Sequence, residues 1–287
     1  MFEVASLTDK GLKRDHNEDS FFVGESVFVV ADGMGGHSGG KKASELFVST
    51  AEEHFKKSSY REAKEFFNHI ISDAINKIEL YAKEANQDPH TTATLALIGD
   101  NKVHFANVGD SRVYIFDEAS LLMRTRDHSI PEMLLQMGEI EEHEMATHPD
   151  QNKLTKSLGL NAQGKATHYS YELKEGSDYM ILLCSDGFWE YVKEEEMRYF
   201  LFHFELEKAL NSMIDLAKKR GGEHGDNISV AVTTLFNDDE NEEIEVTQRI
   251  EKSKATSTKN KYIVPLILSS ALMGIFAIAY YYTKYIA

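Results

Sequence analysis

The stretch Phe28–Gly36, FVVADGMGG, begins as an apolar, β-prone run and ends in a carboxylate followed by three glycines in four residues. The apolar part predicts a buried strand. Because a strand has to end somewhere and Asp-Gly is common turn chemistry, Asp32 could simply mark a turn. That interpretation weakens if other buried strands also end on an aspartate.

The same pattern occurs at three further places in the chain. The strand-like segments are VHFANV before Gly109-Asp110, YMILLC before Ser185-Asp186-Gly187, and ISVAVTTL after Gly225-Asp226-Asn227. Glycine permits close backbone approach, and a strand holds a neighbouring carboxylate rigidly. Hard cations prefer such oxygen ligands. We therefore favour a metal site built at strand ends over four unrelated turns.

Composition sets the limits within which this site must work. The chain has 287 residues, of which 42% are hydrophobic and 27% charged, so it can bury one large core. The net charge of -16 and the lack of a basic stripe argue against nucleic acid as a partner. A protein this acidic could bind phosphate groups only with cations that offset its negative charge. The single cysteine, Cys184, excludes an internal disulfide and is expected to be a buried thiol.

Hydrophobic periodicity predicts one α+β domain over residues 1–236. Apolar residues at helical spacing predict helices over Lys41–Lys57, Arg61–Asn86 and Glu205–Lys219, between clusters of strands. Residues 237–261 are polar, first acidic (NDDENEEIE) and then rich in lysine (KSKATSTKNK), which predicts a flexible charged linker.

The carboxyl-terminal part contains an uncharged apolar run, IVPLILSSALMGIFAIAYYY from Ile263 to Tyr282. At about 1.5 Å per residue it matches the roughly 30 Å hydrocarbon core of a bilayer, so we expect a transmembrane helix over residues 262–283. Met1–Lys13 lacks a basic start followed by an apolar core, so no signal peptide is expected.

Lysines near this helix predict its orientation. Those just before it are Lys252, Lys254, Lys259 and Lys261, whereas only Lys284 follows it. Because positive residues favour the cytoplasmic side, we expect a single-pass protein of the cell membrane with the domain of residues 1–236 in the cytoplasm.

The segment RDHNED, Arg14–Asp19, adds a group suited to phosphate. Arginine offers a planar fork for phosphate oxygens, and Glu18 with Asp19 supplies acceptors for metal-bound water. Alone, this segment would be an exposed charged loop.

The recurring motifs, in chain order, are Arg14–Asp19, Asp32–His37, Gly109–Arg112, Asp127–Ser129, Ser185–Gly187 and Gly225–Asn227. Together they resemble the metal-dependent protein phosphatases (PPM, or type 2C), in particular the compact bacterial branch, over nearly all of residues 1–236.

This resemblance implies a four-layer α-β-β-α sandwich, in which two antiparallel sheets are flanked by helices. It also implies two Mn²⁺ or Mg²⁺ ions at one edge of the sheets. Asp32 would bridge both ions, the Gly33 carbonyl would bind one, and Asp186 with Asp226 would complete the other. Asp110 with Asp186 resembles the pair that holds a third, weaker metal in bacterial members.

The implied reaction is in-line attack of a metal-activated hydroxide on a phosphoserine or phosphothreonine of a protein. Arg14 would hold the non-reacting phosphate oxygens. Expected partners are phosphorylated proteins, among them a cognate Ser/Thr kinase and its substrates. Animal relatives have a histidine directly after the aspartate-glycine pair, proposed as general acid, whereas this chain has Met34. Another group must supply that proton; His37 is near, but a role in capping or lining the loop is at least as good an interpretation.

Two other classes of function fit the sequence less well. A catalytically inactive, membrane-tethered binding module would keep the fold but should have lost a metal aspartate, whereas this chain keeps Asp32, Asp186 and Asp226. A calcium-binding structural domain fails because no local D-x-D-x-D-G loop occurs. We therefore favour an enzyme.

Three further features have mainly structural interpretations. Residues Ile130–Asn161 have the position and composition of the mobile flap found beside the site in these phosphatases. Within this segment, His143 and His148 are expected to be solvated rather than zinc ligands. Trp189, the only tryptophan, is expected to be a core anchor rather than a substrate contact.

Overall fold

A computed structural model of the chain describes residues 3–35, 39–57, 62–99, 101–159, 165–174 and 176–235. The chain divides into two units, Met1–Asn237 and Asp238–Ala287, and the fold below is that of the first. The predicted linker and transmembrane helix lie outside the described residues. Within the described ranges, no helix combines the length and apolar character needed to cross a bilayer.

Among the described residues, two five-stranded sheets and one small sheet form the β-structure, and all paired strands are antiparallel. The first sheet has the order β1 (Val4–Asp9), β13 (Ile228–Leu235), β12 (Tyr179–Cys184), β8 (Arg112–Phe116) and β9 (Leu121–Arg124). The second has the order β11 (Thr167–Glu172), β7 (Lys102–Val108), β6 (Ala93–Ile98), β3 (Val27–Ala31) and β2 (Ser20–Val23). The small sheet joins β10 (Leu158–Gly159), β5 (His90–Thr91) and β4 (Gly33–Met34).

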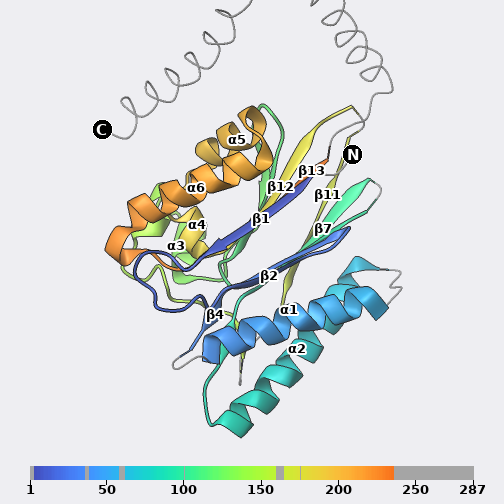
Figure 1. Cartoon of the computed structure of the whole chain (residues 1–287), viewed down its shortest axis with the longest axis vertical. Coiled ribbons are helices and arrows are strands. Elements are labelled where there is room, and N and C mark those ends of the chain that lie inside the picture. Colours follow the sequence, from blue (N-terminus) through green and yellow to red (C-terminus); the bar gives the residue numbers. More distant parts are fainter. Residues whose placement is uncertain are drawn as a thin grey trace, which may run out of the picture. The chain divides into compact units, whose positions relative to one another are not determined.

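Helices cover the outer faces of the two large sheets (Figure 1). The helices are α1 (Gly39–Lys57), α2 (Ala63–Ala85), α3 (Ile130–Met137), α4 (Asp186–Trp189), α5 (Glu194–His203) and α6 (Leu206–Gly221), with 3₁₀ turns η1 (Glu142–Thr147) and η2 (Gly222–His224). Helices α1 and α2 pack on the second sheet, and α4, α5 and α6 pack on the first. The predicted arrangement of two antiparallel sheets flanked by helices is confirmed.

Strands β3 and β12 are apolar along their whole length because both of their faces are buried. In β3, Phe28 and Val30 point into the core between the sheets, while Val29 belongs to the core under α1 and α2. In β12, Ile181 packs between the sheets and Leu182 packs against the helices on the other side. The continuous apolar runs of the sequence are therefore strands sandwiched between layers.

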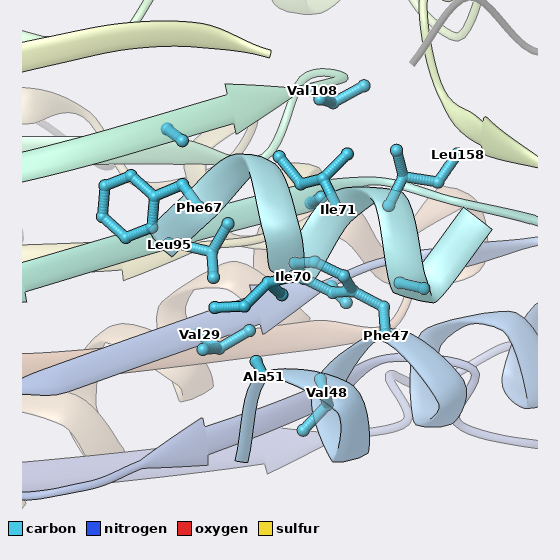
Figure 2. Close-up of a cluster of buried hydrophobic side chains, with 14 of the residues drawn as sticks. Val29, Phe47, Val48, Ala51, Phe67, Ile70, Ile71, Leu95, Val108 and Leu158 are labelled. Atoms are coloured by element: carbon cyan, nitrogen blue, oxygen red, sulfur yellow. The ribbon is translucent and has the colours of Figure 1, made fainter. Parts of the chain in front are cut away.

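The core under α1 and α2 fixes the second sheet in place. Figure 2 shows Phe47 of α1 and Ile70 of α2 gathered with Val29 and Leu95 of the sheet. All four side chains are fully buried. Removal of such apolar surface from water contributes about 25 cal/mol per Å², so this packing holds the strand that leads to Asp32.

The predicted helices occur close to their expected bounds, but other elements were missed. Helix α5 carries Glu194, Glu195 and Glu196 in its first turn, and these acidic residues obscure a short apolar face made by Met197 and Leu201. The strands of the small sheet are two residues each, which is too short to show a period.

Two positions of α2, one buried and one exposed, test how this helix packs against the core. Ile78 is fully buried and Leu80 is 58% exposed on the same helix. We predict that Ile78→Ala lowers the free energy of unfolding by about 2–5 kcal/mol, because it leaves a cavity, whereas Leu80→Ala changes it by less than about 0.5 kcal/mol. Urea denaturation of both variants measures the difference, and equal losses would contradict this core assignment.

Candidate active site

One pocket of about 460 Å³ gathers almost every residue that the sequence motifs predicted for the site. The predicted residues that line it are Arg14, Glu18, Asp32, Gly33, Asp110, Asp186 and Asp226. The others that line it are Met34, Gly35, Asn152, Leu154 and Asn227. Asn152 and Leu154 come from the predicted flap segment. The roles of the individual residues remain predictions.

Strand order explains why distant aspartates meet. Strands β12 and β13 are antiparallel neighbours, so Asp186, after the end of β12, lies at the same edge as Asp226, before the start of β13. Strands β3 and β7 both pair antiparallel with β6 and so run in the same direction. Asp32 and Asp110 follow their ends.

Two threonines clamp the backbone of Asp32. Its N–H donates to Thr92 Oγ1 at 2.8 Å, and its carbonyl accepts from Thr91 Oγ1 at 2.9 Å. The same carbonyl accepts from the Thr92 N–H at 2.8 Å. Thr91 and Thr92 are buried, so the point at which the strand ends is fixed in three directions. Sequence reasoning missed this clamp, because the two segments are far apart in the chain.

Glycines beside the aspartates allow the backbone to approach closely. A Cβ at Gly33 would lie 2.2 Å from the Gly40 carbonyl oxygen and 2.6 Å from that of Glu18. A Cβ at Gly187 would lie 2.1 Å from the Asn227 carbonyl oxygen. All three distances are shorter than any tolerable contact, so neither position accepts a side chain without movement of the backbone. The predicted close approach is therefore present at Asp32-Gly33 and at Asp186-Gly187.

Burial and mutual repulsion dominate the electrostatics of the pocket. Burial raises the pKa of Asp32 and of Asp110 well above the ordinary value, and the nearby Asp186 adds to both shifts. Burial, followed by the charge of Asp226, raises the pKa of Asp186 to about 6. The cluster thus holds more negative charge than its surroundings offset.

Asp19 lies behind the pocket and is 2% exposed. Its Oδ2 accepts from the Ser185 hydroxyl at 2.8 Å, while its Oδ1 has no hydrogen-bond partner in the described part of the chain. Burial raises the pKa of Asp19 to about 7. An unpartnered buried acceptor beside the cluster is a place where a water or another polar group fits.

Arg14 lies at the mouth of the pocket with half of its side chain exposed. Its Nη2 donates to Asp226 Oδ2 at 2.5 Å, and the exposed fractions of the two side chains are 50% and 31%. The guanidinium is the only positive side chain among the described residues that line this pocket. It is the group placed to meet an anion that enters from solvent.

Asn227 ties the loop that carries Arg14 to the start of β13. Its Oδ1 accepts from the Glu18 N–H at 2.8 Å. Its Nδ2 donates to the carbonyls of Lys10 at 3.0 Å and His16 at 2.9 Å. The motif Gly225-Asp226-Asn227 drew attention to this residue only as a neighbour of the aspartate. Its amide in fact sets the position of the arginine loop.

The donor set fits hard divalent cations. The ligand atoms predicted from the sequence are carboxylate oxygens of Asp32, Asp110, Asp186 and Asp226 and the carbonyl of Gly33, and all five residues line one pocket. A cation would offset the repulsion that raises these pKa values. Within the described ranges, no three histidine, cysteine, aspartate or glutamate side chains lie in an arrangement that could hold a metal ion, so the fit rests on the chemistry of these oxygen atoms and on their shared pocket.

Several other predicted residues lie away from the reacting region. Cys184 is buried, as expected. His143 is exposed beside Glu141, and His148 accepts from the Asp150 N–H at 3.1 Å within its own turn. His37 lies outside the described residues, as do the last residues of the predicted flap.

Asp127 and His128, from the motif Asp127–Ser129, support the pocket from outside. The Asp127 carboxylate accepts two hydrogen bonds from Arg112, one from Nε at 2.8 Å and one from Nη2 at 2.6 Å. His128 Nδ1 accepts from the Gly109 N–H at 3.2 Å, so its Nε2 carries the proton and donates to Thr167 Oγ1 at 2.8 Å.

Comparison with known proteins gives one consistent family. A model of "Protein phosphatase 2C" matches residues 12–220. The serine/threonine phosphatase stp of Listeria monocytogenes is 35% identical over 236 residues, which cover 78% of this chain and 92% of that protein.

Two solved structures are also similar. Serine/threonine phosphatase Stp1 from Staphylococcus aureus is 29% identical with a TM-score of 0.75, covering 82% of this chain and 96% of that one. The catalytic domain of protein phosphatase PstP in complex with two manganese ions is 26% identical with a TM-score of 0.70, covering 82% and 99%.

The contacts of His128 predict a loss of stability in acid. Burial, followed by the charge of Lys156, lowers its pKa from 6.5 to about 4. Between these values the unfolded chain binds the proton and the folded chain does not, so the free energy of unfolding falls as pH decreases from 6.5 to 4. We predict that His128→Gln flattens this fall, whereas His143→Gln on the exposed flap does not.

Urea denaturation at several pH values in this window measures the slope for each variant. An unchanged slope in His128→Gln would contradict a half-buried His128 that stays neutral in the folded protein across this window.

Proposed function

The chain belongs to the protein phosphatase 2C family, and we propose that it hydrolyses phosphoserine and phosphothreonine in proteins at the pocket around Asp32. It is a protein serine/threonine phosphatase, and its cofactors are two divalent cations, Mn²⁺ or Mg²⁺. The observation that carries the assignment of the site is the gathering of Arg14 with Asp32, Asp186 and Asp226 in one pocket.

In this proposal, Asp32, Gly33, Asp186 and Asp226 hold the two ions. When bound, the ions supply a nucleophile from water near neutral pH and offset the charge of the phosphate. The hydrogen bonds from Thr91 and Thr92 hold the Asp32 backbone in place, which limits the movement of its carboxylate at the edge of the sheet. As the ligand predicted to be shared, this carboxylate would hold both ions, so its position would matter to each of them.

Arg14 binds and orients the substrate. Its half-exposed guanidinium can turn from Asp226 toward an entering phosphate, whose non-reacting oxygens match its planar fork. This exchange keeps the arginine paired before and during catalysis. Glu18 lines the pocket beside it and, with Asp19, offers acceptors that hold water in place.

The leaving alcohol needs a proton donor. Met34 lines the pocket and has no proton to donate, and in the described part of the chain no histidine lines it. We propose that a water held by Asp110 and Asp186 supplies this proton. One of these carboxylates would accept one hydrogen of such a water and leave its other hydrogen free to pass to the leaving oxygen, and the hydroxide that remains would take a proton from solvent.

An inactive binding module is the alternative function. It would recognise phosphorylated partners without hydrolysing them, and Arg14 alone could serve that purpose. The pocket retains every aspartate of the predicted metal set, which favours the enzyme.

The first test removes the shared ligand. We predict that Asp32→Asn lowers Mn²⁺-dependent turnover of a phosphothreonine peptide by more than about 100-fold. Loss of a residue that only hydrogen-bonds a metal ligand typically costs about 10–100-fold, and Asp32 is proposed to be a ligand itself. Asp215→Asn, at an exposed position of α6, is the matched control and should keep wild-type turnover. Steady-state kinetics with circular dichroism separates lost chemistry from lost fold. A folded Asp32→Asn enzyme with normal turnover would refute the site.

We also propose that the carboxyl-terminal segment anchors the enzyme to the cell membrane with the catalytic domain in the cytoplasm. The support is the apolar run within residues 262–283 and the lysines that precede it. A linker of about 25 residues, at about 5 Å times the square root of its length, would let the domain reach substrates within about 25 Å of the membrane. A membrane-bound Ser/Thr kinase and its substrates are suitable partners.

Cell fractionation tests the anchor. We predict that the full chain sediments with membranes, that a variant ending at Asn237 stays in the soluble fraction, and that external protease digests the domain only after cells are opened. Digestion of the domain in intact cells would reverse the proposed orientation. Soluble full-length protein would exclude the anchor.

A further inference from the structure

Trp189 makes a contact that an anchor of the apolar core would not need. Its Nε1–H donates to the backbone carbonyl of Asp110 at 2.9 Å. Trp189 ends α4, and Asp186 begins the same helix, one turn earlier. Asp110 and Asp186 are the pair predicted to hold the weaker cation. Helix α4 therefore carries the Asp186 carboxylate and also the Trp189 N–H that holds the backbone of Asp110.

The indole is itself held by a buried ion pair. The Arg112 guanidinium carbon lies 3.4 Å from the centroid of the Trp189 ring. Asp127 accepts two hydrogen bonds from Arg112, and the side chains of this pair are 5% and 1% exposed. Tyr114 OH accepts a third at 3.0 Å. Since the guanidinium is fixed on three sides, it gives the indole a rigid surface to stack on.

The stack also reaches the predicted flap. Arg112 Nη2 lies 4.0 Å from the sulfur of Met145, which is the buried residue of η1. On its open side, Trp189 lines a second cavity of about 420 Å³ together with Arg112 and residues of η1. The indole thus lies between the flap and the backbone of Asp110.

We propose that Trp189 is a positioning residue that fixes Asp110 relative to Asp186 and thereby sets the affinity of the cation site formed by this pair. The inference rests on the proposed function for the identity of Asp110 and Asp186 as ligands. The contacts of Trp189 are independent of it.

Intrinsic fluorescence gives a direct readout, because Trp189 is the only tryptophan of the chain. When Mn²⁺ is titrated into the purified full-length protein, we expect a component of quenching at the higher concentrations that fill the weaker site. In Asp110→Asn this component should disappear while any component at low Mn²⁺ remains. The proposal would be overturned if the quenching at higher Mn²⁺ concentrations were unchanged in Asp110→Asn, or if the wild type did not show it.

A second experiment replaces the indole with a smaller ring that has no N–H to donate to the Asp110 carbonyl. We expect Trp189→Phe to raise the Mn²⁺ concentration for half-maximal activity by about 10-fold, with turnover at saturating Mn²⁺ within about twofold of wild type. Tyr114→Phe is the matched control: it removes one hydrogen bond from the same buried cluster without touching Asp110, and its Mn²⁺ requirement should stay unchanged. An unchanged requirement in Trp189→Phe, or an equal rise in both variants, would overturn the positioning role.

The two proposals can fail separately. A folded wild-type protein that hydrolyses no phosphopeptide would remove the proposed function, whereas the fluorescence titration would still report whether a cation binds beside Trp189. An active wild type with a Trp189→Phe variant of normal Mn²⁺ requirement would remove only the positioning role.

Discussion

Repulsion among buried carboxylates is the force that the structure around the pocket has to withstand. Asp32, Asp110 and Asp186 come from different strand ends, and burial together with their mutual charge raises the pKa of each. In a flexible loop such groups would separate or take up protons. Here the ladders of two sheets and the threonine clamp on Asp32 keep them together, which leaves cations as the natural source of compensating charge.

The layered fold supplies the stiffness for this task. Central strands are packed on both faces, so a strand end cannot shift without disturbing two cores. Close backbone contacts at Gly33 and Gly187 lock the turns that follow the aspartates. On the far side of Asp110, the buried pair of Arg112 and Asp127 provides a fixed support. A site made of rigid parts can hold its ligand atoms ready for cations.

Much of the candidate site could be predicted because its signals are local. An aspartate beside a glycine at the end of an apolar run is visible in a few residues, and Asp32, Asp110 and Asp186 were found in this way. The supporting contacts of Thr92 and Asn227 were missed because they join segments far apart in the chain, and no short pattern encodes such pairings. Helix α5 was hidden by its acidic first turn, and the apolar carboxyl-terminal run remains a prediction from sequence.

The central claim is that the clustered carboxylates exist to bind two cations bridged by Asp32. A crystal of the full chain grown with Mn²⁺, measured for anomalous scattering near the manganese edge, tests this claim most directly. The account predicts two strong anomalous peaks in the pocket, one on each side of the Asp32 carboxylate, with the Gly33 carbonyl beside one and Asp186 and Asp226 beside the other. A well-ordered pocket without anomalous density, or with its manganese held away from Asp32, would contradict it.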